Sequence, residues 1–263
     1  MPSAVVRACL FGLAEPANSR VDPGKCHLKL GLAYSNAGDP RSAILSYATA
    51  QMHLGPNTNM HFLCTIESAR ESLKLDLCNL SKVETDLVRV VSKLLGIQDV
   101  RSALLVAECC VLLGDIKLRK GNITSARIWM MRAVAIQSDI GIPSNLCASL
   151  RSLADVLRAE ERYSEARHVL QQVESLQAQH ETDHCVKVLV QAELASLEVL
   201  LDQKNSARER LRGVVRTLRK RTRDGQHIVE ALSDAICGLG ELVAPAKRLR
   251  RKTALECVQQ RAE

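Results

Sequence analysis

A small residue recurs at a fixed interval along this chain of 263 residues. Ala43, Ala126, Ala166 and Ala207 are separated by 83, 40 and 41 residues, and 83 is about twice 41. This spacing predicts five units of about 41 residues, with one unmarked copy near Thr85. Because a unit this short cannot bury its own apolar face, the units must stack on one another.

The best-marked unit covers residues 28–56. Small residues in it let two helices approach closely, and large residues fill the space between them. In chain order these positions are Leu30, Gly31, Tyr34, Ala43, Tyr47 and Ala50. The break at Gly38-Asp39-Pro40 predicts a tight turn, since Gly accepts a positive φ and Pro fixes its own φ. The stretch therefore predicts two antiparallel helices.

Three other units repeat parts of this pattern. Leu113-Gly114 precedes Ala126 and Met130 at the same spacing, with Met130 in place of Tyr47. Leu153-Ala154 and Leu194-Ala195 begin two further copies. The second unit lacks the Gly and aromatic markers. Its second helix is indicated by the capping box Ser81-Lys82-Val83-Glu84, and its first is expected over about residues 60–77.

The order Leu-Gly, Tyr, Ala, aromatic, Ala and Pro in residues 28–56 resembles the tetratricopeptide repeat (TPR). The resemblance implies an all-α, right-handed superhelical solenoid of stacked antiparallel helix pairs. The long period is similar to that of kinesin-light-chain-like members of the superfamily, and HEAT-type repeats have a compatible length. We expect an N-terminal extension over 1–23, about five helical hairpins over 24–225, and C-terminal capping helices over 226–263.

The same resemblance implies a protein-protein interaction scaffold or adaptor that is not an enzyme and needs no cofactor or metal. Such a scaffold binds a peptide or helix in the groove lined by the first helix of each hairpin. Leu28 and Leu32 stand where chaperone-binding relatives carry Lys and Asn, so recognition of chaperone tails is not expected. The expected groove positions are Lys29, Asn36, Asp115, Arg119, Arg151, Asp155 and Arg158.

Two alternatives remain open at this point. Residues 125–173 are similar to the helical repeats of separase, the cohesin-cleaving protease, which would make the chain a regulatory part of a larger machine in chromosome segregation. His180-Glu181-Thr182-Asp183-His184 matches the His-Glu-x-x-His pattern of zinc hydrolases. That chemistry needs one continuous helix, whereas the repeat places the pattern between two hairpins.

The positive charge is concentrated near the C-terminus. Residues 204–252 contain fourteen Lys or Arg and five Asp or Glu, although the whole chain has a net charge of only +7. Lys247, Arg248, Arg250, Arg251 and Lys252 form a basic cluster that looks like a nuclear-import signal and suits an importin or another acidic surface. Aromatic residues are not interleaved with the basic runs, so base stacking on nucleic acid is not expected.

The cysteines and the lengths of the apolar runs indicate in which cellular compartment the chain is expected. Ten cysteines occur without a Cys-x-x-Cys, and Cys109-Cys110 falls within an apolar helical stretch, so we expect free thiols in a reducing, intracellular setting. Apolar runs are too short for a membrane span. The location is therefore expected to be cytoplasmic, nuclear or both, and a targeting role for the N-terminal segment stays open.

Overall fold

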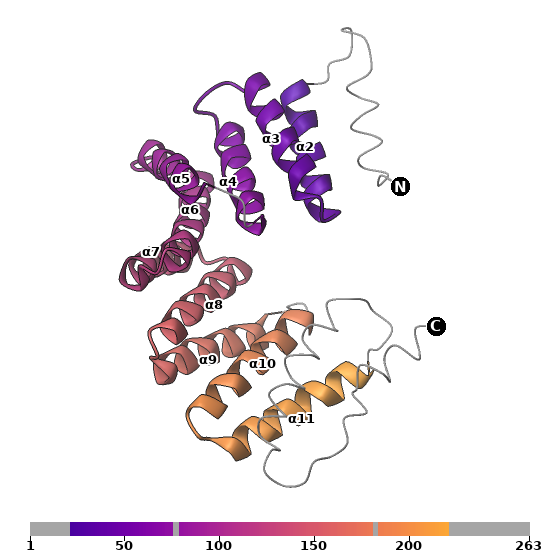
Figure 1. Cartoon of the computed structure of the whole chain (residues 1–263), viewed down its shortest axis with the longest axis vertical. Coiled ribbons are helices and arrows are strands. Elements are labelled where there is room, and N and C mark those ends of the chain that lie inside the picture. Colours follow the sequence, from indigo (N-terminus) through magenta and orange to yellow (C-terminus); the bar gives the residue numbers. More distant parts are fainter. Residues whose placement is uncertain (1–21, 76–78, 181–183, 221–263) are drawn as a thin grey trace. The chain divides into compact units, whose positions relative to one another are not determined.

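The computed structural model describes residues 22–75, 79–180 and 184–220, and these residues form ten helices and no strand (Figure 1). The helices are α2 (Pro23–Asn36), α3 (Pro40–His53), α4 (Asn59–Lys74), α5 (Leu80–Leu94), α6 (Val100–Arg119), α7 (Ile123–Ile140), α8 (Pro143–Ala159), α9 (Tyr163–Gln179), α10 (His184–Leu200) and α11 (Lys204–Lys220). The all-α prediction is confirmed. None of the described helices is long and apolar enough to cross a bilayer.

The chain divides into two compact units, residues 1–162 and 163–263. Within the first unit, α2 packs on α3, α6 on α7, and α4 contacts α3, α5 and α6. Within the second, α10 packs on both α9 and α11. The predicted division into 1–23, 24–225 and 226–263 stays a prediction, because its outer segments lie largely outside the described residues.

Four of the helix pairs are joined by the same turn. After α2, Asp39 N–H donates to Tyr34 O at 3.0 Å and Gly38 N–H donates to Ser35 O at 3.1 Å. Pairs of amides in the same positions close the turns after α6, α8 and α10. This is a Schellman closure, which needs one residue in the left-handed region. Gly38 and Gly121 supply it at φ 75°, whereas Glu161 and Asp202 adopt it without being glycine.

The repeated alanines occupy one position in these helices. Ala43, Ala126, Ala166 and Ala207 are each the fourth residue of their helix and are fully buried. Val83 is the fourth residue of α5, two residues before the place expected near Thr85. Val83 follows Ala43 by 40 residues and precedes Ala126 by 43, because α6 has 20 residues, three more than α8 or α10.

Glycines allow the closest helix contacts. A Cβ on Gly31 of α2 would lie 2.6 Å from Cδ1 of the Tyr47 ring in α3. A Cβ on Gly114 of α6 would lie 2.7 Å from Cε of Met130 in α7. In α4, Ala69 lies five residues before the helix end, as Gly31 and Gly114 do in theirs. The second hairpin thus has a small residue at the crossing, although without a glycine.

A polar network holds the second unit together. The Arg210 guanidinium donates to Glu198 Oε1 at 3.1 Å, to Glu174 Oε1 at 3.2 Å and to Gln191 Oε1 at 2.6 Å. Glu198 is only 3% exposed, so its charge depends on Arg210 for compensation. The network ties α9, α10 and α11 to one another.

The glycine contacts predict different responses to the same substitution. Gly31→Ala drives a methyl group into the rigid, fully buried Tyr47 ring and should lower the free energy of unfolding by about 1–2 kcal/mol, after the gain in helix propensity is subtracted. Gly114→Ala meets the flexible end of Met130, which can rotate away, so we expect a change within about 1 kcal/mol. Chemical denaturation of both variants provides the measurement. Equal losses for the two would contradict the assigned packing.

Candidate functional site

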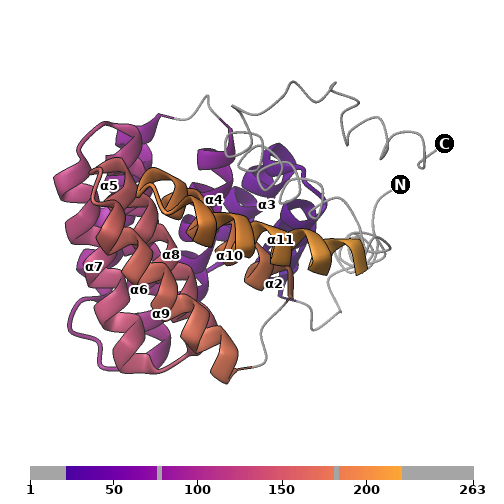
Figure 2. The same ribbon diagram turned by 90° about the horizontal axis from the view of Figure 1, so that it is seen from below.

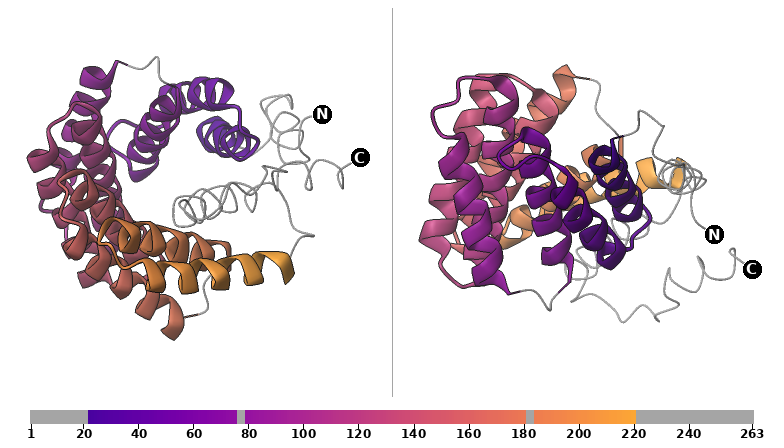
Figure 3. Two further views of the ribbon diagram at one scale, coloured as in Figure 1. Left: turned by 60° about the horizontal axis from the view of Figure 1, so that its bottom comes forward. Right: turned by 90° about the horizontal axis from the view of Figure 1, so that it is seen from above.

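The first helices of the hairpins form a continuous row in the first unit. Among the described helices, α2 contacts α4, α4 contacts α6, and α6 contacts α8. The second helices α3, α5 and α7 do not contact one another. Helices on the inner side of a stack lie closer together than those on the outer side, so the first helices line the inner face (Figures 2 and 3). We call this surface the first-helix row.

The predicted groove residues lie on three helices of this row. Lys29 and Asn36 are exposed on α2. Asp115 and Arg119 are on α6, while Arg151, Asp155 and Arg158 are on α8. The structure brings the predicted residues of α6 and α8 together. Asp115 interacts electrostatically with Arg119 and Asp155, and Arg158 pairs with Asp155 at 2.9 Å. Because α4 lies between α2 and α6, Lys29 and Asn36 belong to a separate part of the row.

Asp115 is a carboxyl of the predicted set with a clearly perturbed pKa. It is half-buried, and burial raises the pKa of Asp115 from its ordinary value of 3.8 to about 6. The nearby Asp155 adds to the rise, whereas Arg119 opposes it. Ionisation of Asp115 therefore costs free energy in the folded chain, and a cation placed beside the carboxylate would reduce that cost.

Helix α4 contributes charged residues to the row that the sequence did not indicate. Arg70 pairs with Glu67 at 2.6 Å and with Glu108 of α6 at 3.4 Å. Glu71 is 1% exposed, and its Oε1 accepts from Ser35 of α2 and pairs with Lys74, both at 2.6 Å. Burial raises the pKa of Glu67, and Arg70 opposes the rise. The Ser35–Glu71 hydrogen bond links α2 to α4, and the Arg70–Glu108 ion pair links α4 to α6.

The sequence did not indicate these charged residues of α4 as part of the row, because the second hairpin lacks the Gly and aromatic markers of the repeat. With no marker in α4, the sequence did not place its faces relative to the groove. The available signal was periodicity: Glu67, Arg70, Glu71 and Lys74 recur at intervals of three or four, as residues on one helix face do.

The zinc-binding pattern does not lie in one described helix. His180 is exposed and follows the end of α9, whereas His184 is the first residue of α10. Residues 181–183 between them lie outside the described residues. Within the described ranges, no group of three His, Cys, Asp or Glu side chains could hold a metal ion.

The paired cysteines are core residues. Cys109 and Cys110 of α6 are fully buried and free. Burial raises the pKa of the Cys110 thiol to about 11 and raises that of Cys109 further. Both thiols are therefore protonated near neutral pH and unreactive. The basic cluster of Lys247, Arg248, Arg250, Arg251 and Lys252 lies outside the described residues, so its import role stays a prediction.

Comparison with known proteins supports the TPR resemblance. A family model of the tetratricopeptide repeat matches residues 107–140, which span most of α6 and all of α7. No curated protein sequence matches the chain. The prediction of a TPR-like repeat is thus confirmed by sequence over this segment.

Solved structures show the same fold. A kinesin-light-chain-type protein from Podosopora anserina, whose own TPR-like repeats are nearly identical to one another, aligns over 78% of this chain and 100% of its own. The sequence identity is 20% and the TM-score is 0.61. A signal-transduction ATPase with a TPR sensor from Pyrococcus horikoshii aligns over 99% of this chain and 43% of its own, with 13% identity and a TM-score of 0.66. A thermophilic TPR protein of Thermus thermophilus aligns over 82% and 98%, with 15% identity and a TM-score of 0.57. The TPR-like solenoid class is confirmed.

The raised pKa of Asp115 predicts a pH-dependent effect of Asp115→Asn. The folded state binds the proton more tightly than the unfolded chain, so stability from the protonated form is present below pH 4 and lost as pH rises through 6. Asn cannot ionise and avoids this loss. We expect Asp115→Asn to have a higher thermal unfolding midpoint than the unmodified chain at pH 7 to 8, and the difference to shrink towards pH 4.

The control is Asp86→Asn, which neutralises a carboxylate of α5 paired with Arg89 on the surface. Its effect on the unfolding midpoint should be small, since exposed ion pairs contribute little. A midpoint difference for Asp115→Asn that is constant from pH 4 to pH 8 would contradict the assignment.

Proposed function

We propose that this chain is a non-catalytic scaffold that binds a peptide or a helix of a partner protein along the first-helix row. The observation that carries the proposal is the direct contact of α2 with α4, α4 with α6 and α6 with α8. These contacts make four helices into one extended surface. Solenoids use such inner surfaces for binding, and protein interaction is the common role of the TPR-like fold.

The charges of the row suggest what kind of segment would bind. Arg70 and Lys74 on α4, Asp115 and Arg119 on α6, and Arg158 on α8 place both signs along the surface. A partner segment with mixed charges would therefore be favoured over a wholly apolar one, and charge order would set its register. A Lys or Arg of the partner beside Asp115 would stabilise the ionised carboxylate and lower its pKa.

The other hypotheses remain predictions from the sequence. A role as the regulatory helical part of a larger machine such as separase, the import function of the basic cluster, and a cytoplasmic or nuclear location are predictions from the sequence. The zinc-hydrolase alternative is the least favoured, because His180 and His184 belong to different described segments.

The proposal predicts a localised loss of binding. In Arg119→Glu/Arg158→Glu, two exposed cations of the row change sign on neighbouring helices. The matched control Arg41→Glu/Lys204→Glu makes the same charge change at exposed positions at the starts of α3 and α11. Tagged chains would be used to isolate partners, and quantitative mass spectrometry would compare them. We expect the row variant alone to lose a subset of partners.

A partner lost in this way would then be purified and titrated calorimetrically against each chain. We expect the row variant to bind at least about tenfold more weakly, and the control to bind normally. Circular dichroism would confirm that both variants remain helical. Equal affinity of the unmodified chain and the row variant for every partner would refute the first-helix row as the binding surface.

A further inference from the structure

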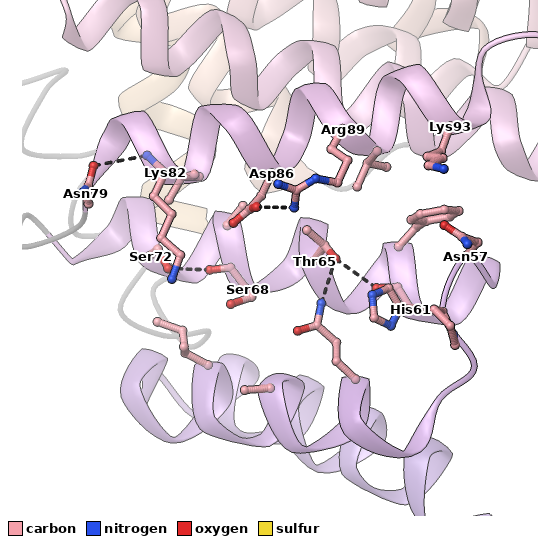
Figure 4. Close-up of a pocket in the computed structure, with 18 residues that line it drawn as sticks. Asn57, His61, Thr65, Ser68, Ser72, Asn79, Lys82, Asp86, Arg89 and Lys93 are labelled. Atoms are coloured by element: carbon pink, nitrogen blue, oxygen red, sulfur yellow. Dashed lines mark hydrogen bonds and ion pairs between the residues drawn. The ribbon is translucent and has the colours of Figure 1, made fainter.

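A second concave site lies on the other side of α4. A groove with a volume of about 590 Å³ is bounded by α3, α4 and α5, and α3 and α5 do not contact each other across it. This volume is within the range of ligand-binding pockets, about 300–1,000 Å³. We call it the outer groove, since two second helices form its walls and α4 forms its floor (Figure 4).

One wall of the outer groove is basic. Lys82, Arg89 and Lys93 all lie on α5 and line the groove, with Lys82 near one end and Lys93 near the other (Figure 4). Arg89 pairs with Asp86 at 2.9 Å and is otherwise exposed. Within the part of the chain that the structure describes, the ammonium groups of Lys82 and Lys93 form no ion pair. The wall therefore has a net positive charge and two uncompensated cations.

The floor of the groove presents hydrogen-bonding groups beside the apolar side chains of Phe62 and Ala69. Thr65, Ser68 and Ser72 of α4 are half-buried and line the groove. The Thr65 hydroxyl donates to His61 O at 3.1 Å and accepts from Gln51 Nε2 at 2.7 Å, and the Ser72 hydroxyl donates to Ser68 O at 2.7 Å. The side-chain carbonyl oxygen of Gln51, on the α3 wall, and the Ser72 hydroxyl oxygen of the floor keep lone pairs that can accept hydrogen bonds.

We propose that the outer groove binds an extended acidic segment of a partner protein. Its carboxylates would pair with Lys82, Arg89 and Lys93, and its backbone N–H groups would donate to the oxygens of the floor. Lys82 and Lys93 are eleven residues apart, which is about 16 Å along the helix. An extended chain covers that length in about five residues. This site is distinct from the first-helix row and goes beyond the proposed function.

The chemistry of the groove favours a peptide over nucleic acid. A phosphate backbone would pair with the basic wall but offers no N–H donors to the hydroxyl oxygens of the floor or to the Gln51 amide oxygen of the α3 wall. Of the two aromatic rings that line the groove, Phe62 is only 6% exposed and cannot stack on a base, and the half-buried His61 ring packs edge to face against it. A peptide with closely spaced Asp or Glu uses both the wall and the floor.

The test uses the full chain and a defined probe, a fluorescent nine-residue peptide in which Glu alternates with Ala. Fluorescence anisotropy would compare the unmodified chain with Lys82→Glu/Lys93→Glu and with the conservative Lys82→Arg/Lys93→Arg. We expect the Glu variant to bind the peptide about tenfold more weakly, or about 1.4 kcal/mol, and the Arg variant to bind normally. Both positions are exposed, and an unchanged thermal midpoint would verify folding.

Two controls distinguish peptide binding in the outer groove from peptide binding to other basic residues of the chain. Arg41→Glu/Lys204→Glu changes the net charge equally at exposed positions outside the groove, and should leave binding unchanged. Because residues 204–252 are also basic, a photo-crosslinkable copy of the peptide would be mapped by mass spectrometry. Crosslinks on α4 or α5 support the proposal. The proposal would be overturned by crosslinks confined to residues 204–252 or by equal binding of the Glu variant. It would also be overturned if a single-stranded oligonucleotide competed more strongly than unlabelled peptide.

Discussion

The close approach of paired helices is the constraint on which the rest of this structure depends. Gly31 against Tyr47 and Gly114 against Met130 bring two backbones together around one large side chain. This contact fixes the axis of each pair and so determines which helix faces are left for neighbouring pairs. The charged surfaces of α4, α6 and α8 are available to a partner only because the apolar faces are already satisfied within the stack.

Much of the fold could be predicted from the sequence because its signals are local. The Leu-Gly to Pro spacing around Gly31 and Pro40 reports on one hairpin, and the spacing of Ala126, Ala166 and Ala207 reports on its repetition. The second hairpin was harder to place. Its small residue is Ala69 instead of Gly, and the 20-residue helix α6 that follows it makes the next interval 43 residues, longer than the others.

The candidate site was less predictable because a helix pattern does not tell which polar face a partner can reach. Asp115 and Asp155 were predicted to share a surface, and the structure places them near each other. The ion pair of Arg70 with Glu108 depends on how α4 packs against α6, which is a contact between hairpins with no sequence marker. The outer groove likewise depends on the separation of α3 from α5.

Helix α4 belongs to both surfaces. Thr65, Ser68 and Ser72 face the outer groove, while Glu67 and Arg70 lie on the opposite side in the first-helix row, as their spacing along a helix requires. An occupant that spreads α3 from α5 would tilt α4 and change its distance from α2 and α6. Helix α4 would then couple the two proposed sites, and occupancy of either one would change the affinity of the other by the same factor.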